Sequence, residues 1–234
     1  IPPTIAGMVL VYRGKWLWGS VLTALFVALQ IKSNHVQMSY YFLFVMLFMA
    51  IAYGVEAYKA KQLPRFWKAT GVLVIAGLIG VATNLSNLYH TYSYSKETMR
   101  GKSELVYEGD AAQQTSSGLN RDYITQWSYG IGETWTLLVP KFKGGASVPL
   151  AANETAMKKA NPLYSNIYTQ LTQYFGEQPM TSGPVYVGAF VLFLFILGCF
   201  IVKGPMKWAL LGATLFSILL SWGKNFMPLT DFFH

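Results

Sequence analysis

Apolar residues in this chain come in long blocks separated by short polar turns, and not at the spacing of a surface helix. A membrane-spanning helix needs about 20 consecutive apolar residues. The blocks therefore predict an all-α integral membrane protein, with about five full transmembrane helices after a partial first one. The partial helix is Pro2–Tyr12, and the full ones are Trp16–Ile31, Met38–Tyr58, Ala69–Leu88, Val185–Val202 and Trp208–Trp222.

One long polar stretch, residues 89–184, interrupts this pattern. A connection of such length is usually either functional or disordered, and its many Tyr and Trp residues argue against disorder. We expect it to fold over one mouth of the helical bundle and to help build an active site. Inside it, the aromatic and amphipathic segments Asp122–Pro140 and Tyr164–Tyr174 predict short helices on the membrane surface.

The domain order predicted in this way is transmembrane helices over residues 1–88, the long loop over 89–184, a transmembrane hairpin over 185–222 and a tail over 223–234. The chain begins at Ile1 without Met, so we expect it to be a piece of a longer protein.

The composition agrees with a membrane protein, because 53% of the residues are hydrophobic and 12% are charged, against about 25% charged in soluble domains. The net charge of +8 would suggest a nucleic-acid partner in a soluble protein. Here the cations lie in the short turns, where they set membrane orientation, and no nucleic-acid partner is predicted. These cations are Arg13, Lys15, Lys59, Lys61, Arg65, Lys68, Lys203 and Lys207.

The positive-inside rule places these basic turns in the cytoplasm. The long loop, the Asn34–His35 turn and the tail then share the extracytoplasmic side. The lipid bilayer is the first predicted partner, and the oligomeric state stays open.

Metal chemistry is not predicted. The single Cys199 excludes a disulfide within the chain and a cysteine metal cluster. The three histidines alone are a weak case for zinc.

Polar residues at the outer ends of the spans and in the loop are the candidates for chemistry, because polar groups near a membrane interior are expensive and often functional. A carboxylate can act as a general base, and an arginine fork suits a phosphate. The catalytic residue is unknown, with three candidates: Glu97, Asp122 and Glu133. The substrate-binding candidates are His35, Gln37, Tyr41, Asn84, Asn87, His90, Arg100, Tyr123, Trp127, Trp135 and Lys224.

Each candidate has a purely structural alternative. His35 could be a solvated turn histidine, and Asn84 and Asn87 could cap helices or bond within the bundle. The loop acids could simply pair with arginine. The aromatic residues suit sugars and equally suit a membrane interface.

The sequence resembles the YfhO family of bacterial membrane proteins, most closely its Bacteroidetes members. Four stretches carry the likeness, in this order along the chain: Asn34–Tyr41 (NHVQMSYY), Lys96–Gly101 (KETMRG), Asp122–Gly145 with GETW and VPKFKGG, and Tyr186–Trp222. They run through nearly the whole chain, which would be a middle portion of a longer family protein.

The resemblance implies an enzyme of the GT-C glycosyltransferase type. Such enzymes pass a sugar from a polyprenyl-phosphate donor to a cell-envelope acceptor outside the bacterial cytoplasmic membrane. Their catalytic acid usually lies in the first large outer loop, which here would precede Ile1. The residues of this chain would then line the donor or acceptor site, and no cofactor is implied beyond the lipid-linked sugar.

Two other classes remain open. A transporter or flippase for a lipid-linked substrate would have broken helices and charges near mid-membrane. A non-catalytic membrane scaffold would use the loop to bind an envelope partner.

The transferase hypothesis predicts that Arg100→Ala and His35→Ala in the full-length protein lower sugar transfer to envelope polymer. The reason is that Arg100 would contact the donor phosphate and His35 would line the pocket. Transfer assayed in isolated membranes measures this, and normal transfer by both variants would show the assignment to be wrong.

Overall fold

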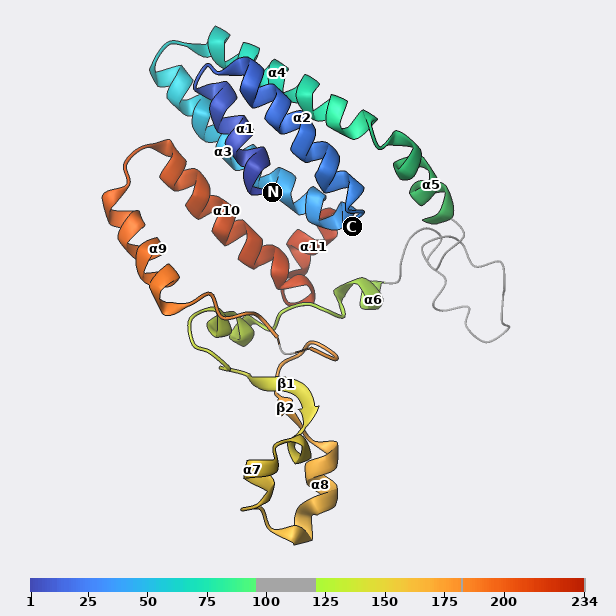
Figure 1. Ribbon diagram of the computed structural model, residues 1–234. Helices are drawn as coiled ribbons and strands as arrows, with labels where there is room; N and C mark the ends of the chain where they lie inside the picture. The colour runs from blue at the N-terminus through green and yellow to red at the C-terminus, as the bar shows by residue number, and fades with distance from the viewer. Residues whose placement is uncertain (96–120, 182, 234) are drawn as a thin grey trace. The chain divides into compact units, whose positions relative to one another are not determined.

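The computed structural model describes residues 1–95, 121–181 and 183–233, apart from the side chains of Val36 and Arg121 (Figure 1). The chain divides into two compact units. The first contains Ile1–Gly118 and Val202–Thr214, and the second contains Leu119–Ile201 and Leu215–His234.

The first unit is helical. Its elements are α1 (Pro2–Tyr12), α2 (Trp16–Lys32), α3 (Val36–Lys59), α4 (Leu63–Ala82), α5 (Leu85–Ser95) and the first part of α10 (Pro205–Ser221). Residues with positive φ lie in the turns between α1 and α4, namely Gly14 at 92°, Asn34 at 59° and Lys61 at 56°. A left-handed residue after the last helical turn is a common way to end a helix. Helices α1, α2 and α3 accordingly end within a residue of the predicted block ends, whereas α4 begins at Leu63 and ends at Ala82, six residues before the predicted Ala69 and Leu88.

Small residues let α1, α2 and α4 approach closely, a packing mode common between membrane helices. A Cβ atom added to Gly7 on α1 would lie 2.9 Å from the Gly19 carbonyl oxygen on α2. One added to Gly80 on α4 would lie 2.7 Å from the Ala24 oxygen on α2. The other two glycines of α4, Gly71 and Gly77, have no described atom within 4 Å of such a Cβ. Among the three glycines of α4, Gly80 is therefore the one that contacts α2.

A small apolar core joins α1, α3 and α4 and consists of Met8, Val11, Met49, Ala69 and Leu73. Many large apolar side chains lie outside it and are exposed on α2, α3 and α4. A soluble monomer rarely exposes so much contiguous apolar surface, so the helices are compatible with a membrane protein.

Two helices in the described part of the chain are long and apolar enough to cross a membrane, namely Gln37–Lys59 and Leu63–Ala82. A third candidate exists if Pro205–Ser221 and Gly223–Phe233 form one span, although they are bent by 113°. The sequence predicts about five spans. The difference arises because the other apolar helices are short, with 17 residues in Trp16–Lys32 and 13 in Ala189–Ile201. Gly188, at a φ of 96°, immediately precedes the second of these.

The second unit consists of short elements. They are α6 (Arg121–Thr125), η1 (Ile131–Leu137), β1 (Gly144–Pro149), η2 (Leu150–Ala152), α7 (Glu154–Met157), η3 (Pro162–Tyr164), α8 (Ser165–Gln170), β2 (Thr172–Tyr174), α9 (Ala189–Ile201), the rest of α10, η4 (Gly223–Phe226) and α11 (Met227–Phe233).

Strands β1 and β2 form a two-stranded antiparallel sheet, with Gly144 opposite Tyr174 and Pro149 opposite Thr172 (Figure 1). This sheet departs from the all-α prediction for a chain that is otherwise mostly helical. The helix predicted to reach Tyr174 ends at Gln170, because Leu171 adopts an extended backbone with ψ at 135°. Thr and Tyr, which favour strands, then pair with β1. The segment Asp122–Pro140, predicted to be helical on the membrane surface, contains two short helices, α6 and η1.

The close approach at Gly80 can be tested against Gly77 on the same helix. Gly80→Ala places a methyl group against backbone of α2, and we expect it to destabilise the protein by about 1–3 kcal/mol. Gly77→Ala meets open space, and we expect an unchanged or slightly raised stability, because alanine favours helix over glycine. Thermal unfolding of the full-length protein in detergent measures both. Equal effects would contradict the proposed helix contact.

Candidate functional site

The second unit contains a buried carboxyl side chain, Glu133, which is only 1% exposed. It lies in η1, where its Oε2 accepts a hydrogen bond from the Gly130 backbone N–H at 2.6 Å. Its Oε1 accepts a hydrogen bond from the Tyr174 hydroxyl. Both oxygens are thus partnered, as a buried carboxyl group requires. Glu133 thereby joins η1 to the end of β2.

Tyr174 completes this contact from the other side. It is buried, and its hydroxyl oxygen accepts a hydrogen bond from the Gln178 backbone N–H at 3.2 Å. Burial, followed by the hydrogen bond to Glu133, raises the pKa of Tyr174 to about 12. The phenol therefore stays protonated and keeps donating at neutral pH. Gly176 lies so close to both groups that any Cβ at this position would collide with them.

Beside this buried pair lies an exposed polar group that we call the Glu177 cluster, made of Glu177, Lys224 and Asn225. The Lys224 Nζ lies 3.1 Å from the Glu177 Oε2. The Asn225 Nδ2 donates to the same oxygen at 3.3 Å. The Glu177 and Lys224 side chains are 46% and 41% exposed, respectively, so solvent and ligands can reach both.

The hydrogen bond from Asn225, followed by that from Lys224, lowers the pKa of Glu177 below its ordinary value. Glu177 is therefore ionised at neutral pH. Its backbone N–H also donates to the Glu133 Oε2 at 3.4 Å, so the buried carboxyl group positions the residue that carries the exposed one.

The bend after α10 supplies Lys224 and Asn225, and backbone contacts fix it to the segment before η1. The Tyr129 N–H donates to the Ser221 carbonyl at 2.8 Å. The Lys224 N–H donates to the Ser128 hydroxyl at 2.9 Å, and the Asn225 amide donates to the Tyr129 carbonyl at 2.8 Å. Residues almost 100 positions apart in sequence are joined in this way.

Chemically, the Glu177 cluster combines three functions. An ionised carboxylate can accept a proton from a hydroxyl group. A lysine ammonium binds phosphate as a compact point charge, and an amide can orient a sugar hydroxyl. No set of three His, Cys, Asp or Glu side chains suited to a metal ion occurs among the described residues.

Two residues of the predicted site, Glu133 and Lys224, come together here through Glu177. Four others lie exposed in the same unit, namely Asp122, Tyr123, Trp127 and Trp135. Tyr123 and Trp127 contact edge to face, with ring centroids 6.3 Å apart. Glu97 and Arg100 lie outside the described residues.

The remaining predicted residues belong to the first unit. His35, Gln37 and Tyr41 are exposed near the start of α3, and Asn87 and His90 are exposed on α5.

Asn84 has a structural partner, because its Nδ2 donates to the Ala28 carbonyl on α2 at 3.0 Å. Gln30 on α2 likewise donates to the Ser39 hydroxyl on α3 at 3.1 Å. The ends of α2 and α4 and the start of α3 therefore gather at one end of this unit.

Tyr174 and Glu177 were not predicted as site residues. A signal was present, since both Gly–Glu dipeptides of the sequence, Gly132-Glu133 and Gly176-Glu177, meet at this site. Their pairing depends on a contact between positions 44 residues apart, which the spacing alone does not reveal.

No protein-family model, no curated protein and no solved structure matches this chain. The family resemblance read from the sequence therefore stays a prediction.

The lowered pKa of Glu177 predicts a pH-dependent contribution to stability. A carboxyl group whose pKa is lower in the folded state stabilises above its unfolded pKa of about 4.3 and loses this effect as the pH falls through its folded pKa. Replacing Lys224 with Gln should lower the melting temperature near pH 7 by a small amount, because exposed ion pairs contribute at most about 1 kcal/mol. The difference from the parent should shrink as the pH falls below about 4.3.

Thermal unfolding of the full-length protein across this range measures the effect, with Lys158→Gln, an exposed lysine of the same unit, as the control. A Lys224→Gln difference that stays constant down to pH 3 would refute the ion pair.

Proposed function

We propose that the chain forms part of a membrane glycosyltransferase, which passes a sugar from a polyprenyl-phosphate donor to a cell-envelope acceptor. The observation that carries the proposal is the Glu177 cluster. The Lys224 ammonium and the Asn225 amide lie 3.1 and 3.3 Å, respectively, from the same oxygen of the ionised Glu177 carboxylate. Candidate membrane spans in the same chain would give access to a lipid-linked donor.

In this proposal the ammonium group of Lys224 binds the donor phosphate, and Glu177 accepts a proton from the acceptor hydroxyl. Asn225 orients Glu177 by its hydrogen bond. Glu133, being buried, is a positioning residue that fixes the backbone of Glu177.

The exposed aromatic rings of Tyr123, Trp127 and Trp135 offer flat faces on which sugar rings can stack. Arg100 and His35 remain further binding candidates on sequence grounds.

The charge of the short turns supports a location in the bacterial cytoplasmic membrane, with the Glu177 cluster on the extracytoplasmic side. The envelope polymer would then be the acceptor partner.

A second candidate function rests on the bend of 113° between α10 and the helices that follow it. Transporters place substrate sites at broken helices, and Lys224 lies at this break. A transporter of a lipid-linked substrate would show substrate counterflow in proteoliposomes without any sugar transfer.

The transferase proposal predicts that Glu177→Gln in the full-length protein lowers sugar transfer by at least about 100-fold, because positioned acid–base catalysis contributes about that much or more. Lys224→Gln should raise the KM for the donor. Transfer of radiolabelled sugar from polyprenyl phosphate in isolated membranes measures both.

Glu154→Gln is the matched control, because Glu154 is an exposed glutamate of the same unit outside the cluster. Unchanged transfer by Glu177→Gln, in a variant that is folded at the assay temperature, would refute the proposed role.

A further inference from the structure

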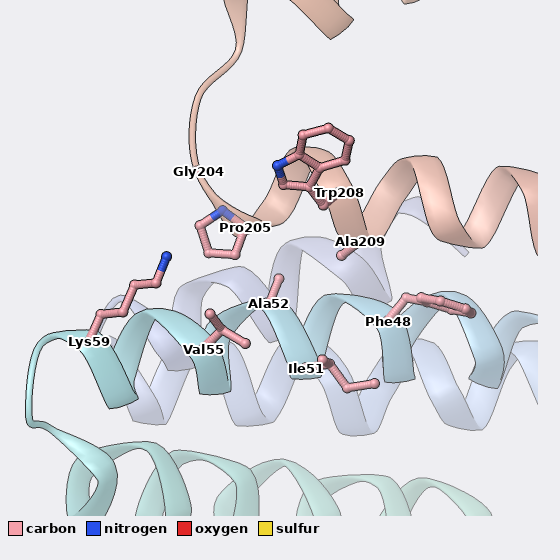
Figure 2. A pocket seen from close by; sticks show the side chains of 9 residues that line it. All are labelled: Phe48, Ile51, Ala52, Val55, Lys59, Gly204, Pro205, Trp208 and Ala209. Carbon is pink, nitrogen blue, oxygen red and sulfur yellow. The ribbon is translucent and has the colours of Figure 1, made fainter.

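A groove runs between α3 and the first part of α10, which both belong to the first unit. Its volume is about 580 Å³, within the range of ordinary ligand sites, about 300–1,000 Å³. Figure 2 shows the side chains that line it: Phe48, Ile51, Ala52, Val55 and Lys59 from α3, and Gly204, Pro205, Trp208 and Ala209 from the other wall. The groove is therefore large enough for a ligand, and it is not filled by the described side chains.

The lining is apolar except at one end. Lys59 is the charged residue of the lining, and Figure 2 shows it at the opposite end of the row from Phe48. The other wall carries a second cation, because the Lys207 Nζ lies 4.8 Å from the centre of the Trp208 ring.

One acidic group faces this end. A Cβ added to Gly204 would lie 3.9 Å from the Glu56 Oε1. Glu56 also lines a smaller cavity of about 190 Å³, and Arg65 lines the same cavity. The groove thus has an apolar body and a mouth where Lys59 is available to an anion.

The length of the groove matches one leaflet of a bilayer. The helical rise of 1.5 Å per residue puts Phe48 and Lys59 about 16 Å apart along α3. Half of a hydrocarbon core is about 15 Å thick. Since α3 is itself a candidate span that ends at Lys59, this places the lysine at headgroup depth and Phe48 near mid-membrane.

We propose that the groove binds one acyl chain of an anionic phospholipid whose phosphate pairs with Lys59. The apolar wall accommodates the chain, and the ammonium group complements the headgroup charge. The site lies at the basic end of the first unit and includes none of the residues assigned to sugar transfer, so the inference does not depend on the proposed function.

A polyprenyl chain is the other lipid phosphate to consider. The groove is only as deep as one leaflet, whereas a polyprenyl chain is much longer than a phospholipid tail. The dimensions therefore favour the phospholipid.

The test uses the full-length protein in nanodiscs of mixed phosphatidylglycerol and phosphatidylcholine. After gentle release into detergent, native mass spectrometry counts the retained lipids. We expect the parent to retain phosphatidylglycerol in preference to phosphatidylcholine. Lys59→Ala should lower this preference about fivefold, because one lysine at an anionic membrane surface contributes about that factor.

Ala209→Phe, which fills the groove, should lower the retention of both lipids, and it leaves Lys59 in place. Lys68→Ala is the matched control, because Lys68 is an exposed lysine near the start of α4 that does not line the groove. This variant should retain phosphatidylglycerol like the parent. Melting temperatures of all three variants verify that they are folded.

Three outcomes would overturn the proposal. The first is retention of both lipids to the same extent by the parent. The second is parent-like retention by both Lys59→Ala and Ala209→Phe. The third is displacement of phosphatidylglycerol by an equimolar amount of added polyprenyl phosphate, which would assign the groove to that lipid.

Discussion

The burial of Glu133 is the constraint on which the second unit depends. Removing a carboxylate from water costs several kcal/mol unless hydrogen bonds replace those of the solvent. The Gly130 N–H and the Tyr174 hydroxyl supply these bonds. This requirement brings η1 against the end of β2 and excludes a side chain at residue 176. The exposed Glu177 follows directly in the chain, so the position of a surface carboxylate is set by a buried one.

The first unit is stabilised differently. In a bilayer, apolar side chains gain little by leaving lipid for protein, so close backbone contact and hydrogen bonds between helices matter more. Gly7, Gly19 and Gly80 provide the contact, and the bond from Asn84 to the Ala28 carbonyl adds a polar link. From the sequence, Asn84 is either a binding candidate or a structural residue. The structure gives it a structural partner, the Ala28 carbonyl.

The sequence predicts α1, α2 and α3 well, because block hydrophobicity and turn residues are local signals. The predicted Ala69–Leu88 span, in contrast, is divided between α4 and α5. The start of α2 at Trp16 and the end of α3 near Tyr58 agree with the predicted boundaries to within a residue. The β1–β2 sheet and the Glu133–Tyr174 bond were not predicted, since both join segments separated by tens of residues. Lys224 was recognised as a candidate from its place at a helix end, but its partner Glu177 could be found only from the fold.

The two ends of the first unit differ in chemistry. At one end lie exposed His35 and the amide of Asn84, and at the other lie Lys59, Arg65 and the groove. A membrane imposes such an asymmetry, because its cytoplasmic leaflet carries anionic lipids that attract lysine and arginine. A single headgroup bound at Lys59 would neutralise charge where the basic turns crowd together. The basic turns that the sequence predicts to orient the chain would then also be the reason for it to retain an anionic lipid.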